Sequence, residues 1–382
     1  MKRLTKVLTL VLTLSMVAAA CGSDDEEAAP AAPATTAAPA APATTAAPAT
    51  TAAPAAPAAP ATTAAPAAPA TTAAPETLKI AMVFGGVVTD LGWIQVVYEG
   101  MKAVVEEFGA DFVMSERIGP AEASEAFRGY GRDGYDIILA AGVGFDSAAA
   151  EVGPDFPDTF FGLINAPAIA DNVAAIVIDQ LALAYYTGVA AALETETGVV
   201  GIINAIEFES TARINEGFTL GVASVSPDIE VLSVYTGAFE DPVLGKAAAA
   251  AMIDAGADII ASALNLGAQG VIEAAQEAGG VRLLGYFVDQ GPMYGVPEVY
   301  LTSALANWPG AARYLAELAI SGEIQGKVYV LDAKNPEFAY LAPWGPSASA
   351  ATIASVEEVM SAFRSGTLEL PPCCPSIDAL EG

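Results

Sequence analysis

Polar and aromatic side chains follow the apolar runs of this sequence at the points where the runs end. These residues are Asp90, Trp93, Phe145, Asn165, Phe239, Asn265 and Asp289. Carboxylates and amides orient a polar ligand through hydrogen bonds, and aromatic rings stack on its flat or apolar parts. If the runs are parallel strands, their carboxyl ends share one edge, where open α/β sheets bind ligands. The pattern therefore indicates binding of a small molecule.

The composition argues against catalysis and against a metal centre. The 382-residue chain contains no histidine, which removes His-based triads, His metal sites and the usual general base. No nucleophile–base pair and no carboxylate dyad is evident from spacing. We therefore expect no enzyme activity, no metal and no cofactor. The adjacent Cys373 and Cys374 leave three readings open, namely a vicinal disulfide, a flexible tail and pairing with another chain.

Short apolar runs bounded by Gly, Asp or Pro supply the elements that would position these residues. The runs are 78–84, 135–141, 159–164, 173–178, 198–204, 229–236, 258–264, 281–288 and 299–305. Continuous apolar runs of this length are typical of parallel strands buried on both faces. Helical patterns lie between them at 93–108, 211–225, 243–255 and 308–320. This alternation predicts an α/β fold with right-handed crossovers.

The strand runs fall into two sets, which predict two lobes with a cleft between them. We expect each lobe to be a parallel sheet flanked by helices, because the part beyond residue 76 exceeds a typical single-core domain. The first lobe is predicted to comprise 76–178 plus about 307–328, and the second 179–306 plus about 329–345. Residues 346–382 are expected to form a C-terminal helix and tail. The apolar segment 180–196 is too short to span a bilayer and is predicted to be a packed helix.

The N-terminal residues predict export and attachment to a membrane. Lys2, Arg3 and Lys6 precede a short apolar run that ends in three alanines and Cys21, which is typical of a secretory signal over residues 1–20. The small residues before Cys21 resemble the lipobox of bacterial lipoproteins, in which the cysteine thiol is acylated. The alternative is an ordinary signal peptide with a chance cysteine. Residues 21–75, which from position 28 contain only Ala, Pro and Thr, predict a disordered linker.

The charge of the chain restricts its partners. The formal net charge is −30 at pH 7, from 15 basic and 45 acidic residues. Such a surface argues against nucleic acid and against anionic lipid surfaces as partners. It does not argue for a cationic ligand, because charge spread over a surface usually serves solubility.

Several segments, in order, resemble the basic membrane protein family, also called purine nucleoside receptor-like lipoproteins. The segments are 90–104, 171–179, 185–205, 215–249, 270–275, 288–290 and 301–305. Members are solute-binding proteins of ABC transporters with the two-lobed type I periplasmic-binding-protein fold. The resemblance implies that fold here, together with an ABC permease as partner and a lipid-anchored position through Cys21 on the outer face of the cell membrane. We expect a monomer.

The chain departs from the family where its nucleoside binders carry polar side chains. It has Ile94 in place of an asparagine, Asn165 and Phe287 in place of aspartates, and Ala306 or Asn307 in place of a lysine. The matching aromatic positions are kept as Trp93 and Phe239. Buried nucleoside hydroxyls without partners would cost about 1–3 kcal/mol each. The resemblance therefore implies a different, flat or partly apolar ligand.

Under this interpretation, four polar side chains orient the ligand. The rest of the expected site consists of Trp93, Ile94, Phe145, Phe239, Phe287 and Asn307. The four are Asp90, Asn165, Asn265 and Asp289. We expect an extracytoplasmic lipoprotein that delivers its ligand to an ABC importer. A ligand sensor that signals to a membrane kinase or chemoreceptor is the alternative from another class. A structural envelope protein with an empty cleft is a further one.

Several of these residues also have a purely structural interpretation. Trp93 is either a cleft wall or the core anchor of the helix that it opens. Asp90 either holds the ligand or caps that helix, and it could do both. Phe287 lies inside an apolar run and is core as often as cleft. Arg213 could meet an anionic group or lie on the surface, and Trp308 is expected to be structural.

Overall fold

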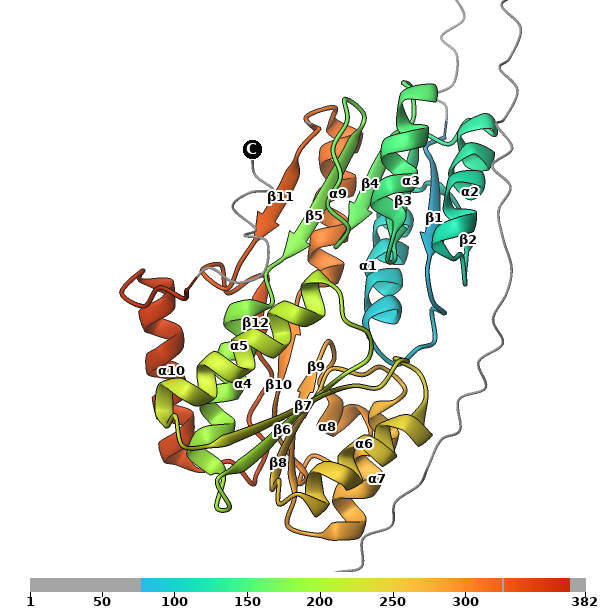
Figure 1. The fold of residues 1–382 in the computed structure, drawn as a ribbon. Coiled ribbons are helices and arrows are strands. Elements are labelled where there is room, and N and C mark those ends of the chain that lie inside the picture. The colour runs from blue at the N-terminus through green and yellow to red at the C-terminus, as the bar shows by residue number, and fades with distance from the viewer. Residues whose placement is uncertain (1–76, 325, 372–382) are drawn as a thin grey trace, which may run out of the picture. The chain divides into compact units, whose positions relative to one another are not determined.

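The computed structural model describes residues 77–324 and 326–371, all within one compact unit of the chain. The signal peptide, Cys21, the linker, Cys373 and Cys374 lie outside the described residues. Two six-stranded sheets form the framework (Figure 1). The first has the order β11-β5-β4-β3-β1-β2, and all of its strand pairs are parallel. Its strands are β1 (Lys79–Phe84), β2 (Asp111–Ser115), β3 (Ile137–Ala141), β4 (Phe160–Ile164), β5 (Val173–Ile178) and β11 (Val328–Leu331).

The second sheet has the order β12-β10-β9-β8-β6-β7. Its strands are β6 (Val199–Asn204), β7 (Glu230–Tyr235), β8 (Ile259–Ser262), β9 (Arg282–Tyr286), β10 (Tyr300–Ala306) and β12 (Ala339–Leu341). Its pairs are parallel except for β12, which runs antiparallel to β10 at the edge. The predicted α/β fold with two sheets is thus confirmed.

Helices cover both faces of each sheet because successive strand residues point to opposite faces. The helices of the first lobe are α1 (Trp93–Phe108), α2 (Pro120–Arg132), α3 (Phe145–Val152) and α9 (Trp308–Ser321), with the 3-10 turn η1 (Gly153–Asp155). Ile80 and Met82 of β1 share a core with α1 and α9, whereas Ala81 and Val83 pack with α2 and α3. Each face of the sheet therefore has its own apolar layer.

The second lobe repeats this arrangement. Its helices are α4 (Leu181–Glu194), α5 (Glu209–Val225), α6 (Pro242–Asp254), α7 (Ala268–Ala278), α8 (Gln290–Met293) and α10 (Ala350–Arg364). Ile202 of β6 faces the core that contains α4 and α5, whereas Ile203 faces α6 and α7. The predicted helix at 180–196 is α4, which is buried along almost its whole length and packs against α5 and α10. Among the described residues, no helix is long and apolar enough to cross a membrane.

The chain passes between the lobes three times. The crossings follow β5, β10 and β11, and the third leads through residues 332–338 to β12. β11 pairs with β5 as far as Leu331, so the first lobe extends to this residue, beyond the boundary expected near residue 328. The residues just after β5 and β10 therefore lie at the boundary between the lobes.

Candidate functional site

Asp90 lies at the boundary between the lobes, in the loop that connects β1 to α1. Its carboxylate is 1% exposed and accepts three backbone N–H bonds, from Gly92 (2.9 Å), Ile94 (3.1 Å) and Gln95 (3.0 Å). The first N–H groups of a helix have no partner within the helix, so this carboxylate satisfies donors that would otherwise be unpaired. Asp90 therefore has the capping role that its position before the helix allows.

The same carboxylate joins the two lobes. Its Oδ2 accepts a hydrogen bond of 2.8 Å from Nδ2 of Asn265, which follows β8 in the second lobe. The Asn265 Oδ1 lies 3.4 Å from the backbone N–H of Trp93. A Cβ built on Gly92 would lie 2.2 Å from this Oδ1, so the close approach requires glycine at this position. The structure thus brings Asp90, Trp93 and Asn265 together, as their places at strand ends predict.

Burial and a second carboxylate set the electrostatics of this contact. Burial raises the pKa of Asp90, and the charge of Glu240 acts in the same direction, whereas the three backbone N–H donors oppose them. Glu240 itself is exposed, and its Oε1 lies 3.4 Å from Nδ2 of Asn265. Asn265 is held in turn by its backbone N–H, which donates to the carbonyl of Phe239 at 3.1 Å. The Asn265 amide therefore faces two acidic groups.

Aromatic rings are present on both sides of the boundary. The half-buried Trp93 packs edge-on against Trp308, with ring centroids 5.7 Å apart. In the second lobe, Phe239 lies 6.3 Å from the ring of Phe208. Phe287 is half-buried and adopts a left-handed backbone with φ of 71°, directly after β9. These rings supply the flat apolar surfaces that stacking on a ligand needs.

Two of the predicted residues are packed inside the first lobe. Phe145 is fully buried in its core, where its ring packs against Phe127 with centroids 5.8 Å apart. Ile94 is 4% exposed and shares a core with α1 and α9. The structure therefore gives both side chains a role in packing, and it does not place Phe145 beside the Asp90–Asn265 contact.

The other predicted residues lie just beyond strand ends, and two of them precede a helix. Asn165 is half-buried with φ of 60°, and its backbone N–H donates to Ile176 O at 2.8 Å. Asp289 precedes α8, and burial raises the pKa of its carboxyl. Asn307 caps α9, since its Oδ1 accepts from the Gly310 N–H at 2.9 Å. Its Nδ2 donates to the carbonyl of Glu337 at 3.1 Å, which ties two chain crossings together.

The sequence reasoning missed an ion pair at the first chain crossing. Arg213 of α5 donates from Nε and Nη2 to Oδ1 of Asp179, at 3.0 and 2.9 Å. Their side chains are 7% and 16% exposed. The Asp179 Oδ1 also accepts from the Leu181 N–H at 2.9 Å. Asp179 directly follows the run 173–178, so the strand-end rule that selected the other residues would have found it too.

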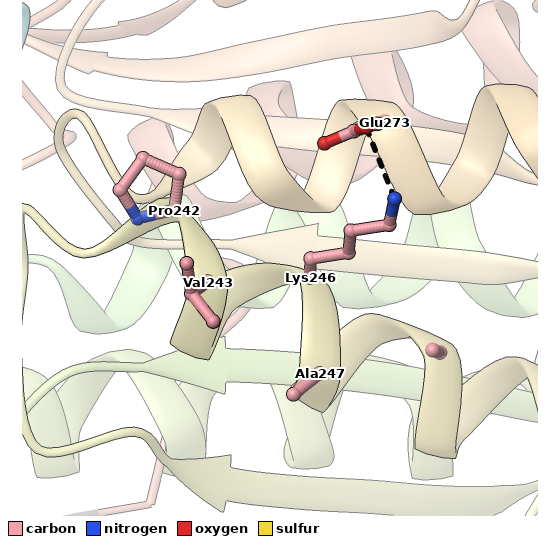
Figure 2. Close-up of a pocket in the computed structure, with 6 residues that line it drawn as sticks. Pro242, Val243, Lys246, Ala247 and Glu273 are labelled. Atoms are coloured by element: carbon pink, nitrogen blue, oxygen red, sulfur yellow. Dashed lines mark ion pairs between the residues drawn. The ribbon is translucent and has the colours of Figure 1, made fainter.

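A surface hollow of about 340 Å³ lies elsewhere, beside α6 and α7 of the second lobe. Figure 2 shows Pro242, Val243 and Ala247 on its wall and Lys246 paired with Glu273, at 3.0 Å. None of the residues predicted from the sequence lines this hollow. Among the described residues, no group of three His, Cys, Asp or Glu side chains is arranged to hold a metal ion.

Curated relatives of this chain include transport and membrane proteins. A putative ABC transporter glucose-binding protein of Haloferax volcanii is 28% identical over 234 residues, which cover 61% of this chain and 59% of that protein. Basic membrane protein A of Borreliella burgdorferi is 30% identical over 234 residues, covering 60% of this chain and 68% of that protein. This chain thus spans less than two thirds of the length of the first of these relatives.

Solved structures show the same fold. A solute-binding protein of an ABC transporter system from Aeropyrum pernix K1 aligns with a TM-score of 0.70 at 22% identity, covering 78% of this chain and 94% of that one. The profile of the family described as ABC transporter substrate-binding protein PnrA-like matches residues 77–336, which confirms the resemblance found in the sequence. This chain therefore belongs to the PnrA-like family of ABC transporter substrate-binding proteins.

Proposed function

We propose that this protein is the extracytoplasmic receptor of an ABC importer, which closes its lobes on a small molecule and presents it to a membrane permease. The observation that carries the proposal is the hydrogen bond between Asp90 and Asn265, two residues from different lobes. It joins strand ends of the two sheets, where ligands of open α/β sheets bind. A ligand that contacts both lobes shifts the balance between open and closed forms toward this arrangement.

The ligand that fits best is flat or partly apolar. At two positions where nucleoside binders of the family carry polar groups, this chain has Ile94, which is buried, and Phe287, which offers a ring. Trp93 and Phe239 keep the aromatic character of the family. A nucleoside would leave its hydroxyl groups without these partners, which makes tight nucleoside binding unfavourable.

Mass spectrometry of small molecules that co-purify with the full chain tests this function. We expect a stoichiometric flat compound, and addition of that compound to stripped protein should reduce the radius of gyration in small-angle X-ray scattering. Calorimetric titration with guanosine and inosine should show no nanomolar binding. A nanomolar dissociation constant for either nucleoside would contradict the proposed ligand class while leaving the receptor function in place.

The proposed position is the outer face of the cell membrane, with a lipid on Cys21. The support is the sequence before this residue, since Cys21 lies outside the described residues. Replacement Cys21→Ser should release the protein from the membrane fraction and abolish incorporation of labelled fatty acid. Retention of both properties would overturn the anchor.

A sensory receptor is the second candidate function. The observation in its favour is a relative from Bacillus subtilis called transcriptional activator protein med, which is 27% identical over 255 residues. The same closing lobes would serve a sensor. Neighbouring permease and ATPase genes would favour transport, whereas a neighbouring kinase gene would favour sensing.

A further inference from the structure

The strand β7 forms an open edge of the second sheet. It is the last strand in the sheet order, beside β6 alone, and Figure 1 shows it between α5 and α6. The N–H groups of Glu230 and Thr236 donate to carbonyls at the two ends of β6, each at 2.9 Å. Because these groups alternate in direction along a strand, the N–H and C=O groups of Val231, Ser233 and Tyr235 point away from β6. Among the described residues, these outward groups have no backbone partner.

The other sheet edges carry features that normally prevent pairing with another chain, namely short length and charge. β12 has three residues, and β11 has four with Lys327 directly before it. β2 begins at the exposed Asp111 and is followed by two charged residues. β7 has six residues, and no charged residue lies between its first residue, Glu230, and Glu240. The edge of β7 therefore lacks this protection.

A hollow of about 360 Å³ lies beside this edge, between β7 and α6. Apolar side chains of both elements line it, among them Leu232, Val234, Ala248, Ala251 and Met252. The alanines of α6 are too short to cover the strand, so Leu232 and Val234 remain half-buried. In a chain of net charge −30, two copies approach each other with least repulsion through neutral surface of this kind. A cationic partner would instead favour the acidic surface.

A second copy of the chain fits this edge in an antiparallel register centred on Ser233. The outward residues then pair across a two-fold axis, Ser233 with its counterpart and Val231 with Tyr235, and each pair exchanges two backbone hydrogen bonds. Val231 and Tyr235 form a β-branched–aromatic pair, which is favourable across strands. On the face toward α6, Leu232 lies opposite Val234 of the second copy, beside the hollow. The edge is thus complementary to itself on both faces.

Charge favours this register over its neighbours. With Ser233 at the centre, Glu230 lies opposite the neutral Thr236 of the second copy. A register centred on Tyr235 would place Glu230 opposite Glu240, and like charges directly opposite are unfavourable. A shift in the other direction would bring the proline three residues before the strand into the pairing, where it has no N–H to donate.

We propose that β7 is a dimerisation surface, through which two copies pair antiparallel about a two-fold axis at Ser233. The sequence led us to expect a monomer, and the open edge is the observation that favours a dimer. This inference goes beyond the proposed receptor function, because β7 belongs to the second sheet and the pairing does not involve the strands of the first. One strand and the neighbouring surface of α6 make a small interface, so we expect a dissociation constant in the micromolar range.

Sedimentation equilibrium tests the association, with the full chain carrying Cys21→Ser so that no lipid causes it. A reducing agent keeps Cys373 and Cys374 from linking two copies. We expect the mass to rise from that of one chain toward that of two as the protein concentration increases. Added salt should strengthen the dimer, because it screens the repulsion between two acidic copies. The mass of one chain at every concentration and salt, or a dimer that forms only without the reducing agent, would overturn the inference.

Opposite charges at Ser233 test the register. Ser233 is exposed and lies on the proposed axis, so Ser233→Lys and Ser233→Asp each place two like charges against each other. Each variant should weaken the dimer about tenfold, and an equimolar mixture should form the heterodimer, detected by native mass spectrometry. Met114→Lys, at the outer edge of β2, is the matched control and should leave the dimer unchanged. Unchanged association of both Ser233 variants, or a mixture that forms no heterodimer, would contradict the inference.

Ser233→Pro tests the backbone pairing. The Ser233 N–H points away from β6, so proline removes a donor to the second copy and none to β6. We expect this variant to keep its circular dichroism spectrum and to lose the dimer. Ser233→Ala, which keeps the N–H, is the control and should associate like the wild type. A folded Ser233→Pro variant with unchanged association would show that the copies do not pair through β7.

Discussion

Two polar contacts at the boundary between the lobes differ in where they lie along the chain. The Asp179–Arg213 ion pair joins residues 34 positions apart, beside the point where the chain leaves the first lobe. The Asp90–Asn265 hydrogen bond joins residues 175 positions apart. Asp179 is fixed further by its backbone N–H, which donates to Leu331 O at 2.7 Å, and by Leu181. Under the proposed function, the first contact therefore belongs to the hinge, and the second depends on closure of the lobes.

Because of this difference, the two contacts should control different properties, namely the stability of the fold and the closure of the lobes. A hinge contact moves with the crossing strands and can persist when the lobes rotate, so its loss should affect the free energy of unfolding. The Asp90–Asn265 bond has to break on opening, so its loss should affect the ratio of closed to open forms. Each contact can therefore be altered with a different readout.

Arg213→Met should produce the largest effect, a loss of up to about 3–5 kcal/mol in the free energy of unfolding, because it leaves the largely buried Asp179 carboxylate without its counter-charge. Urea denaturation measures this change. Lys246→Met is the control, since its ion pairs with Glu273 and Glu277 are largely exposed and such pairs contribute about 0–1 kcal/mol. Equal losses of unfolding free energy in the two variants would show that the Asp179–Arg213 pair stabilises the fold no more than an exposed ion pair does.

An ion pair inside the second lobe provides a contact that does not cross the boundary between the lobes. Its contribution to the stability of the fold should depend on pH, whereas closure of the lobes should not change. The Glu194 carboxylate contacts Arg282 and accepts from the Ser349 N–H at 2.9 Å. Burial alone would raise the pKa of Glu194, but its hydrogen bonds, including one from Thr352, outweigh this and lower it to about 2. The carboxylate therefore contributes stability that is complete above its unfolded pKa of about 4.5 and is lost as the pH falls toward 2.

The measurement is the melting temperature between pH 6 and pH 2.5. The wild-type protein should lose stability across this range, and Glu194→Gln should be less stable at pH 6 but show a flatter profile. A profile of the variant that falls as steeply as that of the wild type would assign the acid loss to other carboxylates. Glu151, which is exposed and bound to Arg128, supplies a control as Glu151→Gln.

Gly92→Ala should block closure while leaving both lobes folded. The new Cβ would lie 2.2 Å from the Asn265 Oδ1, so the lobes cannot approach to the observed distance. We expect the closed form, measured by small-angle X-ray scattering with bound ligand, to fall at least tenfold. The double variant Gly92→Ala with Asn265→Gly removes the clashing side chain and should recover part of the closure. If Gly92→Ala closes normally, the contact does not define the closed form.

The fold was predictable where strands are buried on both faces. All nine apolar runs correspond to strands of the two sheets, and eight of them are strands with a buried, continuous apolar signal. The ninth, β7, is a partly exposed edge strand whose alternating apolar residues still marked it. β2, β11 and β12 were missed. They are short edge strands, and residues such as Asp111 and Tyr340 are exposed there, so the sequence carries no such signal.

The arrangement of the candidate site residues was predictable as far as strand ends determine it. Asp90, Trp93 and Asn265 meet as expected, because carboxyl ends of parallel strands share an edge. Phe145 also follows a strand, but its ring turns into the core, and sequence position does not reveal the direction of a side chain. Trp308, expected to be structural, carries an unpaired buried N–H next to Trp93. Its surroundings depend on the packing of α1 against α9, which lie far apart in the sequence.

Asn265→Ala should have the smallest effect, and it should change closure of the lobes without changing the stability of the fold. It removes one hydrogen bond to Asp90 but leaves the three backbone donors, so the closed form should lose about 1 kcal/mol relative to the open form. Because apparent affinity scales with the closed fraction, the ligand should bind about fivefold more weakly with unchanged unfolding free energy. Asn265→Asp places a carboxylate against Asp90 and should weaken binding further, more so at pH 8 than at pH 5. If Asn265→Ala instead lowered the free energy of unfolding and left affinity unchanged, this contact would act like the hinge pair, and the two would no longer differ in kind.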